Sequence, residues 1–196
     1  MEELSKLGFR YRALFPIPLA ILTIIFANPT ISSLIYGSIL VLLGSIIRVI
    51  CLGYLGVKSR DEIPNIANLI TAGPYKYSRN PVYIANTIIA TGFVITAFGG
   101  YGMIVTVLVS LITVIIYISF YNFLVIPSEE KFLEEKFGQE YLEYKQNVPR
   151  WLINFKNIEE KGRFRFLPVF RTEYWTWIII IALYLIILVK GKIIKI

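Results

Sequence analysis

Histidine does not occur in this chain of 196 residues, and cysteine occurs once, at Cys51. The absence of histidine excludes His-ligated metal sites, serine–histidine triads and histidine proton shuttles, so acid–base chemistry must use Asp, Glu, Lys, Tyr or Cys. A single cysteine cannot form an internal disulfide. Because Cys51 lies inside an apolar run, we interpret it as a small buried hydrophobe. We expect neither a metal site nor a disulfide framework.

Charged residues are also scarce. They make up 17% of the chain, against about 25% in an average soluble domain. Apolar residues make up 56%, and the mean hydropathy is +0.66. A soluble domain of this length cannot hide so much apolar side chain in its core, so this composition excludes a soluble enzyme and a disordered chain. The length allows one domain, and we expect residues 1–196 to form a single integral membrane domain.

Five apolar runs predict helices that cross the membrane, since a run of about 18 apolar residues marks a membrane span. Turn signals separate two pairs of runs, at Asn28–Thr30 and at Gly99–Gly102, where the flanking apolar helices indicate a turn and not a cofactor loop. The fourth run should end at Pro127. The predicted fold class is all-α, a multi-pass membrane helix bundle with about five transmembrane helices. The five runs are Ala13–Ala27, Ile31–Val57, Val82–Phe98, Met103–Ile126 and Tyr174–Val189.

The basic residues predict the orientation of the bundle. A net charge of +7 could indicate nucleic acid, but these residues flank the apolar runs, which is the positive-inside pattern of membrane proteins. Sixteen of the 20 Lys and Arg residues lie in the N-terminal tail, in Lys58–Arg79 and in Lys131–Arg171, and none lies in the two turns. We expect a protein of the cell membrane with these three segments on the cytoplasmic side, and no nucleic-acid partner. Three lysines follow the last helix, 174–189, which leaves open whether that helix crosses fully.

The segment Ser128–Val148 differs from the apolar runs because it is charged and amphipathic. Apolar side chains recur on one face at helical spacing, and Glu and Lys occupy the other face. We predict a cytoplasmic amphipathic helix between the fourth and fifth spans. The apolar face carries Leu133, Phe137, Tyr141, Tyr144 and Val148.

Two patches dense in Tyr, Arg and Glu stand out, Gly73–Tyr83 and Glu129–Arg150. They lie at the cytoplasmic ends of the third and fourth spans, which a tight turn makes neighbours, so we expect the patches to meet in space. Within the first patch, Asn80 suits the N-cap of the third span and Pro81 its first helical position. A plain membrane anchor would not need such patches.

Both patches resemble the isoprenylcysteine carboxyl methyltransferase family, which is related to the membrane phospholipid N-methyltransferases. The resemblance covers 47–152, and its two separated halves occur in the family's order. One departure is Asn80, which stands where the family usually has His. The residues that carry the resemblance are Gly73-Pro74-Tyr75, Arg79-Asn80-Pro81-Val82-Tyr83, Glu129-Glu130, Phe137-Gly138, Glu140-Tyr141, Tyr144, Val148-Pro149-Arg150 and, in the preceding helix, Arg48 to Gly56.

The resemblance implies an all-helical membrane enzyme that uses S-adenosylmethionine, with a lateral opening for a lipid-like substrate. It implies that the methyl acceptor is a lipid or belongs to a lipidated or hydrophobic molecule, and that membrane lipids surround the enzyme. The implied catalytic residues are Glu129, Glu130 and Arg48, of which the glutamates would orient the cofactor or act as base. Arg48 would pair with one of those glutamates or with the cofactor's carboxylate. The implied cofactor-binding residues are Tyr75, Arg79, Asn80, Pro81, Tyr83, Tyr141, Tyr144 and Arg150.

Each of these residues also has a structural interpretation, which the sequence leaves open. Arg48 could extend to the cytoplasmic surface, Asn80 could only cap a helix, and Arg150 could be an interfacial anchor. The glutamate pair could be a solvated first helical turn, and the tyrosines of the amphipathic helix could only dock it on the membrane.

The acceptor is open as well. A carboxylate is already ionised near neutral pH and needs no base, whereas an ammonium headgroup must first lose a proton. The absence of histidine therefore favours a carboxylate, as in prenylcysteine O-methylation, over an ethanolamine-type phospholipid. Outside this chemistry, a nucleotide-using membrane reductase and a non-catalytic membrane scaffold remain as alternatives.

Overall fold

The computed structural model describes residues 2–56, 68–151 and 158–191. Most of the predicted polar connection Lys58–Thr71 lies outside these ranges. Every regular element within them is helical, which confirms the predicted all-α class. In chain order they are α1 (Glu2–Arg10), α2 (Pro16–Ile25), α3 (Ile31–Leu55), the 3₁₀ turn η2 (Gly73–Lys76), α4 (Pro81–Phe98), the 3₁₀ turn η3 (Gly99–Tyr101), α5 (Met103–Phe120), the π-turn η4 (Tyr121–Val125), α6 (Ile126–Phe137), α7 (Gln139–Asn147) and α8 (Phe166–Lys190).

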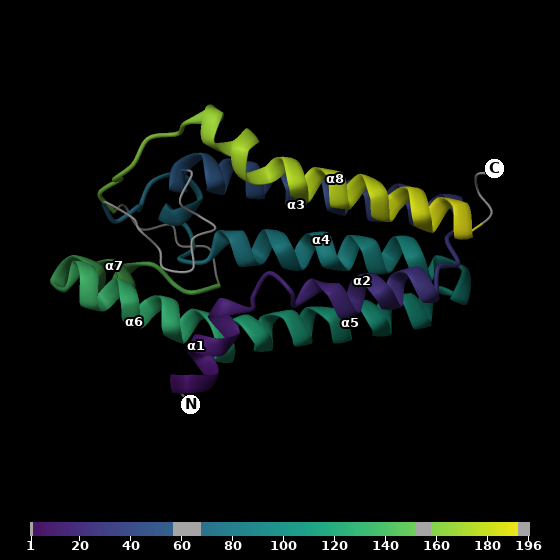
Figure 1. Ribbon diagram of the computed structural model, residues 1–196, viewed down its shortest axis with the longest axis horizontal. Coiled ribbons are helices and arrows are strands. Elements are labelled where there is room, and N and C mark those ends of the chain that lie inside the picture. Colours follow the sequence, from purple (N-terminus) through teal and green to yellow (C-terminus); the bar gives the residue numbers. More distant parts are fainter. Residues whose placement is uncertain (1, 57–67, 152–157, 192–196) are drawn as a thin grey trace.

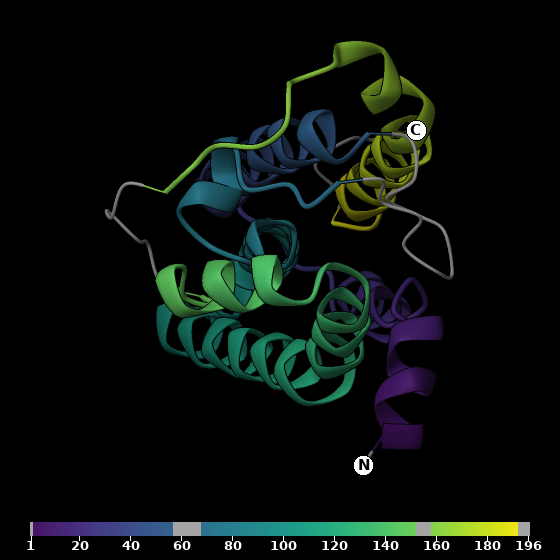
Figure 2. The same cartoon turned by 90° about the vertical axis from the view of Figure 1, so that its left-hand side faces the viewer.

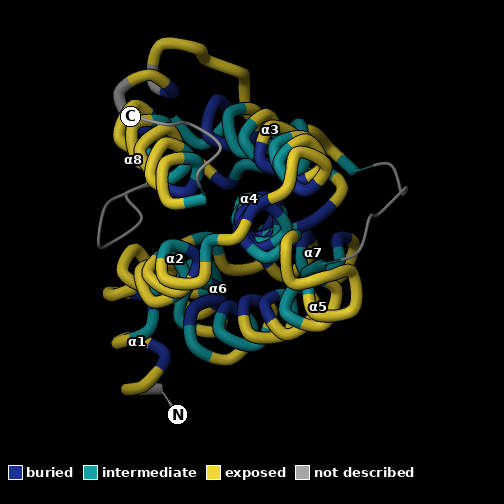
Figure 3. The backbone as a smooth tube through the Cα atoms, turned by 90° about the vertical axis from the view of Figure 1, so that its right-hand side faces the viewer, coloured by how far each residue is buried: buried dark blue, intermediate teal, exposed yellow. Residues whose placement is uncertain are grey.

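The long helices run along one common axis, with α6 and α7 at one end (Figure 1). Seen from that end, α4 lies in the middle, with α3 and α8 on one side of it and α5 on the other (Figure 2). The burial pattern agrees, because the buried residues of the bundle concentrate on α4 while the outer faces of the other helices are exposed (Figure 3). The exposed side chains of α5 are almost all aliphatic, as expected of a surface that faces lipid.

Small residues let α3 and α4 approach until their backbones touch. A Cβ added to Gly37 would lie 2.5 Å from the Gly92 carbonyl oxygen, and one added to Gly92 would lie 2.7 Å from the Gly37 carbonyl oxygen. Close packing of this kind drives helix association in lipid, where the hydrophobic effect between helices is absent. Thr30 starts α3 with a capping box, in which its side chain and that of Ser33 each accept the other's backbone N–H.

Within the described ranges, four helices are long and apolar enough to cross a membrane, namely Ile31–Leu55, Pro81–Tyr101, Met103–Phe137 and Thr172–Lys190. The first predicted crossing is different, because α2 has 10 residues, or about 15 Å at 1.5 Å per residue. The chain nevertheless runs along the bundle there. The Phe15 ring stacks on Phe120 at 3.6 Å near the α6 end, and the Asn28 backbone N–H donates to the Ala97 carbonyl at the far end. The part of the chain that the structure describes thus passes along the bundle five times, with four passes of full length.

Two predicted helix boundaries are wrong. The fourth run does not end at Pro127, because η4 leads directly into α6 and the proline occupies its first turn, where its missing N–H leaves no helical bond unmade. The π-turn is marked by the Ile126 N–H, which donates to the Tyr121 carbonyl five residues back. The last helix begins at Phe166 and not at Tyr174, since Phe166 and Phe170 continue the apolar face before the hydrophobic run.

The amphipathic segment forms two helices where one was predicted. Gly138 separates α6 from α7 with a φ of 53°, a left-handed conformation that glycine adopts without strain. The predicted apolar face is confirmed, but it packs inside the protein. Tyr141, Tyr144 and Val148 form a core cluster with Leu69, against which Leu133 and Phe137 also pack. The interpretation that the two tyrosines dock the segment on the membrane surface is therefore wrong.

Candidate active site

The first patch is shaped by a 3₁₀ turn that leads into α4. Gly73 has a φ of 62°, and a Cβ there would lie 2.2 Å from the Tyr54 ring, so both the backbone angle and the space require glycine. Two residues later, the turn buries Tyr75. Pro81 begins α4, as predicted.

The two patches meet, which confirms the expected neighbourhood. The Tyr83 hydroxyl of α4 donates to Glu129 Oε2 of α6 at 2.8 Å. The Tyr144 hydroxyl of α7 donates to the Tyr75 carbonyl at 2.8 Å. The Arg79 backbone N–H donates to the Pro149 carbonyl at 2.9 Å. Residues about 50 to 70 positions apart in the chain are thus held side by side at one end of the bundle.

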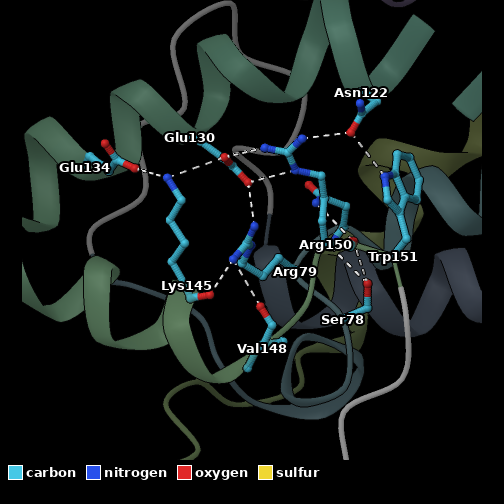
Figure 4. A network of polar contacts seen from close by, with 10 residues as sticks. Ser78, Arg79, Asn122, Glu130, Glu134, Lys145, Val148, Arg150 and Trp151 are labelled. Atoms are coloured by element: carbon cyan, nitrogen blue, oxygen red, sulfur yellow. Dashed lines mark hydrogen bonds and ion pairs between the residues drawn. The ribbon is translucent and has the colours of Figure 1, made fainter. Parts of the chain in front are cut away.

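Glu130 is a buried carboxylate at the centre of a network of cations (Figure 4). Its Oε1 accepts from Arg79 Nη2 at 2.9 Å and from Arg150 Nε at 3.2 Å. Its Oε2 accepts from Arg150 Nη2 at 2.7 Å, and the Lys145 ammonium lies 3.7 Å away. Glu130 is 7% exposed, so the interpretation of this glutamate as part of a solvated helical turn is wrong.

The cations of this network also bind groups besides Glu130. Arg79 Nη1 donates to the carbonyls of Lys145 and Val148, at 2.6 and 3.1 Å, and so satisfies carbonyls at the end of α7. Arg150 Nη1 donates to Asn122 Oδ1 at 2.7 Å. Arg150 therefore ties the end of the second patch to the π-turn, which is a more specific role than that of an interfacial anchor. Neither Asn122 nor Lys145 belongs to the motifs that carry the resemblance, so sequence reasoning missed both.

Asn80 occupies the N-cap position of α4, but the predicted side-chain cap is wrong, because its side chain makes no capping hydrogen bond. Its Nδ2 instead donates to the Arg150 carbonyl at 3.2 Å, an oxygen that also accepts from the Ser78 hydroxyl at 3.0 Å. The amide therefore donates a hydrogen bond to the second patch. Sequence reasoning missed this contact because it depends on how the two patches pack together.

Arg48 does not pair with Glu129 or Glu130, nor does it extend to the surface. Its Nε donates to Glu173 Oε2 at 2.6 Å, its Nη2 donates to Glu173 Oε1 at 3.0 Å, and its Nη1 donates to Asn86 Oδ1. The side chains of Arg48 and Glu173 are 16% and 1% exposed. Sequence reasoning missed Glu173, although a carboxylate at the edge of an apolar run is a signal that a buried partner is needed.

Two buried polar atoms of the motif residues have no hydrogen-bond partner within the part of the chain that the structure describes, Tyr75 Oη and Arg79 Nε. Burial raises the pKa of Tyr75, and the nearby Glu129 carboxylate adds to this effect. Burial likewise raises the pKa of Tyr141 and of Tyr144. The Tyr75 hydroxyl therefore stays protonated near neutral pH and is available as a donor.

Comparison with known proteins assigns the chain that forms this site to a family. Residues 32–140, more than half of the chain, match the family model of the phospholipid methyltransferases. The chain belongs to the phospholipid methyltransferase family. The matched range runs from α3 to the start of α7 and contains Tyr75, Arg79, Tyr83, Glu129 and Glu130. The matched range does not include Arg150, at the end of the second patch, or α8, the last helix of the bundle.

One curated relative has no described function. A segment of 39 residues is 56% identical to an uncharacterised protein of Haemophilus influenzae, and it makes up 20% of this chain and 62% of that protein. The chain thus spans less than two thirds of the length of this relative. No solved structure matches the chain.

Proposed function

We propose that this protein is a membrane methyltransferase that uses S-adenosylmethionine and methylates a lipidated or hydrophobic acceptor. The family assignment supports methyl transfer. The observation that supports the cofactor is a pair of buried donors without a hydrogen-bond partner among the described residues, Tyr75 Oη and Arg79 Nε. Both belong to motif residues beside Glu129 and the Glu130 network. Buried polar groups are nearly always hydrogen-bonded, so such atoms are candidates for contact with a ligand.

The groups at this site match the chemistry of S-adenosylmethionine. The cofactor offers a carboxylate and ring nitrogens as acceptors, and an ammonium and ribose hydroxyls as donors. Arg79 Nε and the Tyr75 hydroxyl would serve the acceptors, and the Glu129 carboxylate would serve the donors. The other expected cofactor-binding residues lie on the same segments. Asn80, Tyr83, Tyr141, Tyr144 and Arg150 contact these groups or one another, and Pro81 begins the helix that carries Tyr83.

The two glutamates take different roles in this proposal. Both Glu130 oxygens accept hydrogen bonds from guanidinium groups, so Glu130 holds Arg79 and Arg150 in place and is a poor base. Glu129 accepts from the neutral Tyr83 hydroxyl and also lies near the Arg12 guanidinium, and of the two glutamates we assign it the role of taking a proton. When bound, S-adenosylmethionine supplies an electrophilic methyl group on sulfur. The protein's task is then to align the acceptor and to exclude water.

The preferred acceptor is a carboxylate, as in prenylcysteine O-methylation. A carboxylate is ionised near neutral pH and needs no base, which suits a chain without histidine. The second candidate is an ethanolamine-type phospholipid, which the name of the matched family favours. Its ammonium must lose a proton before it can attack, and Glu129 is the group placed to accept that proton.

A matched pair of variants tests the cofactor site. Tyr75→Phe removes a hydroxyl that has no partner among the described residues, so it should leave stability unchanged or raise it. The same change should weaken S-adenosylhomocysteine binding about three- to tenfold, the effect of one lost hydrogen bond. Ser110→Ala, which removes another such hydroxyl from the middle of α5, is the control and should leave binding unchanged. Equal affinity of Tyr75→Phe and wild type, by calorimetry in detergent, would remove Tyr75 from the site.

The reaction itself is tested by radiolabelled methyl transfer from S-adenosylmethionine to a total lipid and prenylcysteine extract, followed by identification of the product. A labelled ester supports the carboxylate acceptor, and a labelled phospholipid headgroup supports the alternative. Calorimetry with NADPH beside S-adenosylhomocysteine separates the remaining classes. Binding of NADPH alone would indicate a reductase, and binding of neither would indicate a scaffold.

A further inference from the structure

A buried ion pair joins the last helix to the rest of the bundle. Arg48 of α3 and Glu173 of α8 form two hydrogen bonds, of 2.6 and 3.0 Å, and their side chains are 16% and 1% exposed. A charged pair inside an apolar bundle is expensive unless its geometry is good and its remaining donors are satisfied. Here the third guanidinium donor is satisfied by Asn86 of α4. The arrangement lies partly outside the matched family range, because α8 does not belong to that range.

From Asn86 the contacts continue to the candidate site. Because Asn86 Oδ1 accepts from Arg48, its Nδ2 is left to donate to the Tyr121 hydroxyl, at 3.1 Å. The Tyr121 ring is stacked on Tyr83, with centroids 4.3 Å apart and 18° between the planes. The Tyr83 hydroxyl donates to Glu129. We name this series the relay: Glu173, Arg48, Asn86, Tyr121, Tyr83 and Glu129.

The position of Tyr121 in the chain supports a special role. It is the first residue of the π-turn η4 and is 2% exposed. A π-turn adds a residue to a helical turn, and such turns occur often at functional sites. The ring is packed among Phe15, Tyr117 and Phe120 as well as Tyr83, so it has little freedom to rotate. Its hydroxyl is thus held by Asn86 while its face sets the plane of Tyr83.

We propose that the relay positions the Glu129 carboxylate, and that Glu173, Asn86 and Tyr121 are positioning residues of the active site. Arg48, which the family resemblance implied to be catalytic, then acts through Asn86 and Tyr121 and does not touch the reacting groups. The proposal rests on the proposed function, in which Glu129 contacts the cofactor or the acceptor. It makes α8 part of the working enzyme and not only an additional anchor.

A double-mutant cycle between Tyr121→Phe and Glu129→Gln tests the relay. Tyr121→Phe keeps the stacked ring and removes only the hydroxyl that Asn86 holds. If the relay acts through Glu129, this change should weaken S-adenosylhomocysteine binding at least about threefold in the wild-type background and less than about 1.5-fold in the Glu129→Gln background. Glu173→Gln should show the same dependence on Glu129. Tyr117→Phe is the control, because Tyr117 packs on the Tyr121 ring from the same core cluster but lies outside the relay, and its effect should not depend on Glu129.

The same cycle is measured by thermal melting of the four ligand-free proteins, so that it does not depend on cofactor binding. Coupling between the two positions in either readout supports the relay. Additive effects in both readouts, or an equal dependence of Tyr117→Phe on Glu129, would overturn it. A wild-type protein that binds no S-adenosylhomocysteine refutes the proposed function, whereas the melting cycle still decides the relay. If Tyr121→Phe were coupled to Glu129→Gln but Glu173→Gln were not, the relay would not include α8.

Discussion

The charge of Glu130 is the most informative single perturbation, because one buried carboxylate is bonded to two guanidinium groups. Glu130→Gln keeps the size and removes the charge, and one of its new amide N–H groups would face a guanidinium donor. Three hydrogen bonds of 2.7 to 3.2 Å would be lost or weakened. Breaking a buried pair by removing one partner costs about 3–5 kcal/mol. Since Arg79 and Arg150 keep other acceptors, we expect about 3 kcal/mol, at the lower end of that range.

The assay is reversible unfolding in mixed micelles, in which the free energy of unfolding is compared between variants and wild type. Glu134→Gln is the matched control. It is the same chemical change one turn along α6, at a glutamate whose side chain is 36% exposed and is paired with Lys145. An exposed pair contributes about 0–1 kcal/mol. If the two variants lost the same free energy of unfolding, Glu130 would not be the buried centre of this network. The proposed arrangement of Arg79 and Arg150 around Glu130 would then be wrong.

Three further predictions follow from particular contacts. For topology, Tyr101→Cys in a Cys51→Ala background should react with an impermeant thiol reagent from the outer side of the cell membrane. The reason is that Tyr101 is exposed in a turn that carries no basic residue. Reaction from the cytoplasmic side alone would contradict this orientation. Asn80→Leu should lose about 1 kcal/mol of stability from its missing hydrogen bond, and it should also lose methyl transfer activity. Asn80→His should keep both stability and activity, since an imidazole can also donate. Normal melting and turnover of Asn80→Leu would exclude a positional role for Asn80. The exposed Lys76 ammonium, which donates to Glu160 at 2.7 Å, holds the pKa of that carboxyl below its ordinary value of 4.5. The stabilisation is present above 4.5 and is lost as the pH falls through the lower folded pKa, so the melting difference between wild type and Glu160→Gln should vanish in acid; a difference that grows in acid would show the opposite linkage.

The sequence by itself determined the elements that depend on composition and local pattern. Long apolar runs are helical in lipid because every backbone N–H and carbonyl must be bonded within its own segment, and this predicted α3, α4, α5 and most of α8. Pro81 predicted the start of α4, since a proline is suited to a first helical turn. The order of two motifs around a tight turn predicted that the patches would meet. The helices and the turn follow from interactions between residues near one another in the chain, and that turn brings the two patches together.

Only the tertiary structure decided which partner each polar side chain takes. Arg48 pairs with Glu173, which lies 125 positions further along the chain, because the packing of α8 on α3 places that carboxylate nearer than Glu129 or Glu130. Asn80 donates to a carbonyl of the second patch and does not cap its own helix. Pro127 continues a helix that it was expected to end, since the π-turn before it places the proline in a first helical turn. Hydrogen bonds and ion pairs are short-ranged and directional, so their partners are set by how the helices pack, which the pattern of a single segment does not contain.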